Sequence, residues 1–68
     1  MEIATIGFKD FETGDEARAI IRVIGENTGL ALSLKKNGDM EVFFGADALN
    51  KIIEALQQAR MIVGKSRE

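Results

Sequence analysis

Two alternating segments followed by one long amphipathic segment most constrain what this chain can fold into; together they occupy residues 30–63. In residues 30–35 every second residue is leucine, and residues 40–44 alternate between apolar and other side chains in the same way. A period of two predicts strands that place one apolar face toward a core. The Asn-Gly pair between them predicts a hairpin turn.

The loop of this hairpin has to keep both apolar sets on one face, because a slip of one residue reverses every side chain. A two-residue turn at Asn37-Gly38 would mix the two faces. A three-residue loop that starts at Lys36 avoids this, with Gly38 in the left-handed conformation. The predicted pairs are Leu34 with Met40, Leu32 with Val42 and Leu30 with Phe44.

Residues 46–63 have the spacing of an amphipathic helix. Gly45 can act as its N-cap, Asp47 suits the positive end of the helix dipole, and Gly64 is a typical residue for a helix end. The apolar surface covers about half of the cylinder, more than the ~100° stripe that one sheet face requires. We therefore expect a second contact, at a candidate helix interface of Ala48, Ala55, Ala59 and Ile62.

Two more strands are predicted earlier in the chain, at residues 2–9 and 17–24. They are separated by an acidic turn at residues 10–16, and a second turn cluster follows at residues 25–29. A helix is the rival interpretation of residues 17–24, but their branched side chains favour a strand. The predicted pairs are Val23 with Leu30, Ile21 with Leu32 and Ala19 with Leu34.

These elements predict an α+β fold: a four-stranded antiparallel β-meander in the order 1-2-3-4, with one C-terminal amphipathic helix packed on one face. Residues 1–64 would form a single domain and residues 65–68 a frayed polar tail. A chain of 68 residues buries only about 60% of its unfolded surface, so a single copy would be marginally stable. Association with itself, as a homodimer, is therefore expected.

The composition argues against several function classes. The chain has no histidine, cysteine, tyrosine or tryptophan, so the commonest general base and the strongest nucleophile are absent and no catalysis is expected. The acidic turn lacks the ligand order of a calcium loop, so neither a metal nor a cofactor is expected. The longest apolar runs are far shorter than a membrane span, and we expect a cytoplasmic protein without a membrane contact.

The sheet face opposite the helix is the first candidate functional surface. Its apolar residues form a candidate interaction face of Ile20, Ile24, Ala31, Phe43 and Phe11. Its bases form a candidate site for anions or nucleic acid: Lys9, Arg18, Arg22 and Lys35, against the single acid Glu41.

Two functions fit such a face. An apolar patch with a polar rim is typical of a protein contact, which favours a non-catalytic association module, most simply a homodimer. The alternative is single-stranded nucleic-acid binding, with bases stacked on the phenylalanines and phosphates on the basic side chains. The net charge of −2 favours the first interpretation. Whether the sheet face or the helix interface makes the contact stays open.

Overall fold

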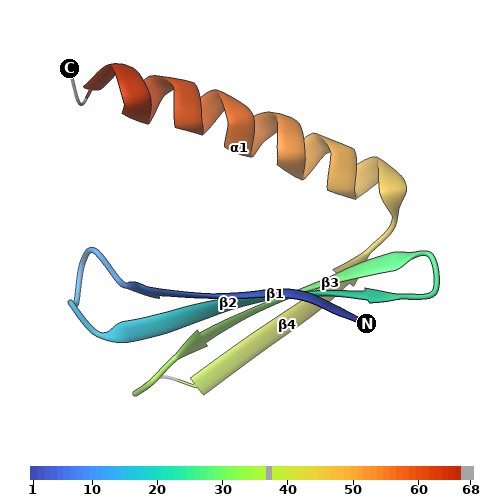
Figure 1. The fold of residues 1–68 in the computed structure, drawn as a ribbon, viewed down its shortest axis with the longest axis horizontal. Helices are drawn as coiled ribbons and strands as arrows, with labels where there is room; N and C mark the ends of the chain where they lie inside the picture. The colour runs from blue at the N-terminus through green and yellow to red at the C-terminus, as the bar shows by residue number, and fades with distance from the viewer. Residues whose placement is uncertain (37, 67–68) are drawn as a thin grey trace.

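A computed structural model of the chain describes residues 1–36 and 38–66. The elements are, in order, β1 (Glu2–Lys9), β2 (Glu16–Ile24), β3 (Asn27–Leu34), β4 (Gly38–Phe44) and α1 (Ala46–Ser66). The strands form one antiparallel sheet in the order β1-β2-β3-β4, and α1 runs back over one of its faces (Figure 1). The predicted α+β meander with a C-terminal helix is confirmed.

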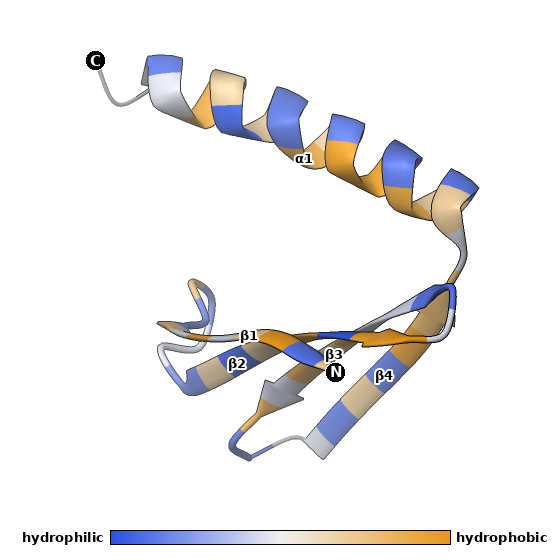
Figure 2. Ribbon diagram, turned by 45° about the vertical axis from the view of Figure 1, so that its right-hand side comes forward, coloured by the Kyte–Doolittle hydropathy of each residue, from blue (hydrophilic) through white to orange (hydrophobic). Residues whose placement is uncertain are grey.

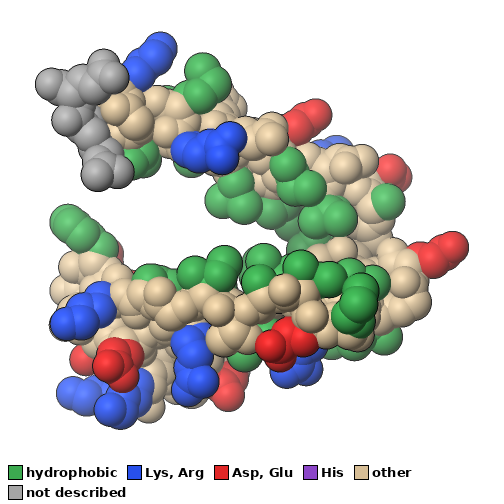
Figure 3. Space-filling model, in the orientation of Figure 1, with side chains coloured by type: hydrophobic (Ala, Val, Ile, Leu, Met, Phe, Trp, Pro, Cys, Tyr) green, Lys and Arg blue, Asp and Glu red, His purple; other side chains and the backbone are tan. Residues whose placement is uncertain are grey.

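The sheet has one apolar and one polar face, as the alternation of residues predicts. Hydrophobic residues lie on the side of the α1 ribbon that looks toward the sheet (Figure 2). Hydrophobic side chains cover the sheet surface that looks toward α1 (Figure 3). We call this sheet surface the inner face and the opposite one the outer face. From the strand register, the inner face consists of Ala4, Ile6, Phe8, Ala17, Ala19, Ile21, Val23, Thr28, Leu30, Leu32, Leu34, Met40, Val42 and Phe44.

The pairing of β2 with β3 differs from the prediction by two residues. Ile21 pairs with Leu30 instead of Leu32, because the strands are joined by a tight two-residue turn at Gly25-Glu26. Gly25 has φ 62°, as the first central residue of a type II′ turn requires. A shift of two residues leaves every side chain on its predicted face.

The pairing of β3 with β4 is shifted in the same way. Gly38 has the expected positive φ, 86°, but it pairs directly with Leu34, so the loop lies one residue earlier than predicted. Leu32 consequently pairs with Met40 instead of Val42. Asn37, which belongs to the predicted loop, lies outside the described residues.

The helix begins as predicted and ends later. Gly45 is the single residue between β4 and α1, and its carbonyl oxygen accepts a hydrogen bond from the Leu49 N–H at 3.0 Å, the first of the helical ladder. The predicted end at Gly64 is wrong, because this residue does not take the left-handed conformation that ends a helix. Lys65 and Ser66 of the predicted tail therefore belong to α1, and residues 67–68 lie outside the described residues.

Contact between helix and sheet is confined to the start of α1. Among the helix side chains that the structure describes, only Leu49 and Ile52 are half-buried, and the others are exposed. From this point α1 and the sheet diverge, leaving an open mouth with hydrophobic side chains on both walls (Figure 3). The helix thus lies on the predicted side of the sheet but packs on it over only about its first two turns.

The single chain has almost no core as a result. Within the described part of the chain only Ala17, Gly29 and Ala31 are buried. The chain exposes 5831 Å², whereas a compact monomer of 7.4 kDa exposes about 4,200 Å². Its radius of gyration is 13.6 Å, compared with about 11 Å for a compact domain of this length. Each copy therefore exposes about 1,600 Å² more than a compact fold would.

The turn that sets the β2–β3 register gives a testable prediction. Gly25→Ala places a Cβ at φ 62°, so the free energy of unfolding should fall by about 1–2 kcal/mol in urea titrations. Gly7→Ala is the matched control, since its Cβ meets open space and its φ is not positive, and it should raise stability by about 0.4–1 kcal/mol. Equal stability of the Gly25 variant and the wild type would contradict this turn geometry.

Candidate association surface

The mouth between α1 and the inner face leaves large apolar side chains exposed on both of its walls. On the sheet wall Met40 is 68% exposed, and on the helix wall Leu56 is 63% exposed. These exposed fractions are unusually high, because the apolar faces of a helix and a sheet normally pack against each other and exclude water. The other large exposed side chains of the walls are Ile6, Phe8, Leu32, Val42, Ile53, Ile62 and Val63.

The local structure explains why these side chains converge. Strand alternation sends every second residue of the sheet to the inner face, and Leu49, Ile52, Leu56 and Val63 follow the spacing of one helix stripe. The one-residue connection at Gly45 sets α1 at an angle to the sheet, so this stripe leaves the sheet surface after Ile52. The mouth therefore lies between the helix and the sheet face that the sequence predicted to be packed against each other.

Sequence reasoning missed the mouth as a functional surface, because it assumed that α1 covers the inner face. One signal for it was present: the apolar surface of the helix is wider than a single sheet contact requires. The structure places the predicted helix interface on this wide surface, and all four of its residues are exposed in the single chain: Ala48, Ala55, Ala59 and Ile62.

The predicted apolar patch on the outer face is smaller than expected. Ile20 and Ala31 are cross-strand neighbours there, but Ala31 is buried and Ile20 half-buried, so Ile24 and Phe43 supply most of the exposed surface. Phe11 does not belong to this face. It lies in the turn between β1 and β2 and is fully exposed.

Phe43 is partly occupied by an intrachain contact. Its ring lies over Gly29 on the neighbouring strand, where a Cβ would come within 2.7 Å of Phe43 Cε1. Glycine lets the ring approach the backbone this closely, and a cross-strand pair of this kind stabilises the sheet. Part of the Phe43 ring is therefore used in packing β4 against β3, and only the rest of it is accessible to a partner.

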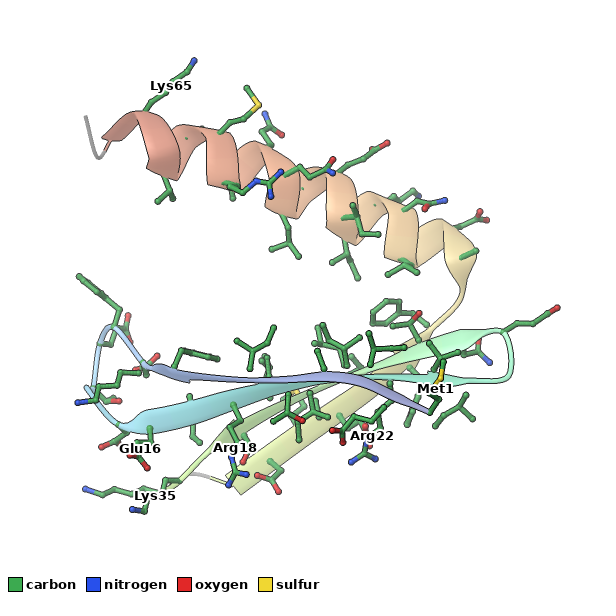
Figure 4. All side chains as sticks on the ribbon, viewed as in Figure 1. Met1, Glu16, Arg18, Arg22, Lys35 and Lys65 are labelled. Carbon is green, nitrogen blue, oxygen red and sulfur yellow. The ribbon has the colours of Figure 1, made fainter. Side chains whose placement is uncertain are left out.

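The bases of the outer face are accompanied by acids. Side chains of Glu16, Arg18, Arg22 and Lys35 all lie on the side of the sheet away from α1 (Figure 4). A shallow depression at one end of this face is lined by Lys9, Arg18 and Lys35, but also by Glu16 and Asp39. The expected ratio of four bases to one acid is therefore wrong, because it omitted Glu16 and Asp39, which follow the turns, and Glu2, which lies opposite Arg22.

Two of the four bases are paired with carboxylates. Arg22 Nη1 lies 3.6 Å from Glu41 Oε2, and Lys35 Nζ lies 3.9 Å from Glu16 Oε2. Both pairs are substantially exposed, so each contributes at most about 1 kcal/mol. Their main effect is to cancel charge: the outer face is of mixed sign, not a basic strip.

The acidic turn between β1 and β2 is organised by its own hydrogen bonds. Asp10 Oδ2 accepts from the Thr13 N–H and from the Thr13 hydroxyl, both at 2.9 Å. These two donors hold the pKa of the Asp10 carboxyl below its ordinary value. Among the described residues no group of three acids is arranged to hold a metal ion, so the turn is a capped loop in its observed form.

Comparison with known proteins adds no relative: no protein-family model, no curated protein and no solved structure matches this chain. The helix does not have the combination of length and hydropathy needed to cross a membrane, within the residues that the structure covers. Evidence about function therefore comes from the surfaces themselves.

The Asp10 turn predicts a pH effect. Thr13→Ala removes the hydroxyl donor and keeps the amide, so the Asp10 pKa should rise part of the way back toward 3.8. Because the folded-state pKa is lowered, the charged carboxyl stabilises the fold above the unfolded value, and this contribution is lost as pH falls through the folded pKa. NMR titration of the carboxyl carbons tests both points, with Glu26→Gln in the other turn as a control. An Asp10 pKa equal to 3.8 in wild type and variant would refute the assignment.

Proposed function

We propose that this chain is a non-catalytic protein-association module that acts as a homodimer, each copy closing the mouth of the other with apolar surface. The observation that supports the proposal is the pair of uncovered apolar walls, on α1 and on the inner face, within one chain. Each wall exposes large aliphatic side chains to water. Burying these side chains against another surface would contribute a favourable hydrophobic free energy.

The amount of uncovered surface fits a permanent dimer. Two copies that each cover about 1,600 Å² would bury about 3,200 Å² in total, within the roughly 2,000–5,000 Å² found for obligate homodimers. The strongly apolar character of both walls also matches obligate interfaces, which resemble a domain core divided between two chains.

A second copy is the favoured partner because it offers both kinds of wall. Two-fold symmetry brings the same patch of each copy together, so a surface that combines a helix wall with a sheet wall can be self-complementary. An unrelated partner would need its own matching pair of walls. The sequence left open whether the outer sheet face or the helix makes the contact. The proposed contact uses the helix, together with the inner face of the sheet in place of the outer.

Leu56→Asp tests the proposal. Leu56 is 63% exposed in the single chain, so replacing it removes little intrachain packing but places a charge in the proposed interface. We expect the dimer dissociation constant to rise by about 100-fold, together with a lower unfolding midpoint, in sedimentation equilibrium and urea titrations.

Gln57→Asp is the matched control, since it adds the same charge on the adjacent, polar side of α1 and should leave both quantities unchanged. A Leu56 variant with the mass and the unfolding midpoint of the wild type would overturn the proposal, as would a wild-type chain that stays monomeric at all concentrations.

Single-stranded nucleic-acid binding on the outer face is the second candidate. One observation favours it: in the described part of the chain Lys9 and Arg18 form no ion pair, and both line the depression on that face. The acids Glu16, Asp39 and Glu41 on the same face oppose it, because they repel phosphates.

Fluorescence anisotropy with a short single-stranded oligonucleotide at low salt separates the two candidates. Under the association proposal we expect no salt-sensitive binding. Binding that is lost in Arg18→Glu and kept in Lys51→Glu, which makes the same charge change on the polar side of α1, would support the nucleic-acid candidate instead. Each phosphate contact removed should reduce the salt slope by about 0.7.

A further inference from the structure

Both walls of the mouth are uncovered at the same end of the molecule. On α1, Leu49 and Ile52 are half-buried, whereas residues 56–65 are exposed. On the inner face, Phe44 beside the start of α1 is half-buried, whereas Phe8 at the opposite end of the sheet is exposed. The uncovered half of the helix thus lies over the uncovered end of the sheet (Figure 1), and the space-filling view shows an open mouth between them (Figure 3).

We infer that the C-terminal half of α1 of one copy packs on the uncovered end of the inner face of a second copy, and reciprocally. This inference rests on the proposed homodimer and specifies which walls meet. A contact between two helices alone would leave both sheets open, and a contact between two sheets alone would leave both helices open. Reciprocal helix-on-sheet packing covers both walls of both copies, as the roughly 1,600 Å² of excess surface per copy requires.

Helix-on-sheet packing also suits the shape of the two surfaces. The apolar surface of α1 is about half of its cylinder, wide enough to contact two neighbours at once. In the proposed dimer, the helix stripe with Leu56 and Val63 can contact the partner's sheet. The neighbouring stripe with Ala55 and Ala59 is then free to contact a second apolar surface, such as the partner's helix. The inner face presents large aliphatic residues at this end, among them Ile6 and Met40.

Charge complementarity points to the same arrangement. In the described part of the chain, the second half of α1 carries Arg60 beside the apolar stripe and no acid, whereas its other base, Lys65, points away from the sheet (Figure 4). The uncovered end of the sheet is bordered by the acidic turn, with Glu12 at its tip and Asp10 and Asp15 at its base. Asp15 pairs with Lys36 and Asp10 accepts hydrogen bonds from Thr13, both within the same chain. The Glu12 carboxylate takes part in none of the described ion pairs, so its charge is available to a base of a second copy.

Cysteine cross-linking tests the inference, because the chain has no cysteine of its own. Phe8→Cys and Val63→Cys are purified separately, mixed in urea, refolded together and treated with a short bismaleimide. Every Phe8–Val63 cross-link is then intermolecular by construction. We expect a covalent heterodimer as the main product on a denaturing gel.

Gln58→Cys, on the polar side of α1, replaces Val63→Cys in the control mixture and should leave the chains uncoupled. A dimeric mass with no Phe8–Val63 product would overturn the inference and leave the proposed homodimer standing. A monomeric mass in all mixtures would overturn both, so the two failures are distinguishable.

Discussion

The fold depends on one constraint: a single residue, Gly45, joins the sheet to a helix whose described side chains are half-buried only at Leu49 and Ile52. Beyond that contact, the apolar side of α1 and large side chains at the far end of the inner face, such as Phe8 and Met40, are exposed. An unfolded chain of 7.4 kDa exposes about 10,700 Å², so folding as one copy buries a little under half of it, whereas about 60% is usual for a domain of this size. The backbone hydrogen bonds of the sheet are formed. However, hydrophobic burial contributes less to the free energy of folding of one copy than it does in a compact domain of this size.

The strands and their faces could be predicted because they depend on local patterns. Alternation in residues 17–24 and 40–44 decides which side chains share a face, and the observed registers preserve those faces. The registers themselves were wrong by two residues, since pattern alone does not separate pairings that differ by an even step. The residues of the turn decide between these pairings. The glycine at position 25 indicated a two-residue type II′ turn, but the surrounding cluster at residues 25–29 suggested a longer loop.

The site was harder to predict than the fold because it depends on the angle at which two elements meet. An amphipathic helix after an amphipathic sheet predicts a two-layer fold in which the helix covers the sheet along its whole length. No residue pattern in the sequence predicts that α1 diverges from the sheet after Ile52. The outer face misled for a related reason: its bases were visible in the strands, whereas Glu16, which pairs with Lys35, and the further acid Asp39 stand beside turns. On this account the outer face is the solvated side of the sheet, and the mouth is where the free energy of association is gained.

The most direct test of this account is the concentration dependence of unfolding of the wild-type chain. If folding is completed by a second copy, the midpoint of urea or thermal unfolding should rise steadily with protein concentration, because mass action stabilises the associated state. A midpoint independent of concentration, measured on a chain with the 7.4 kDa mass of a monomer, would contradict the account. It would mean that the helix and sheet of one copy suffice.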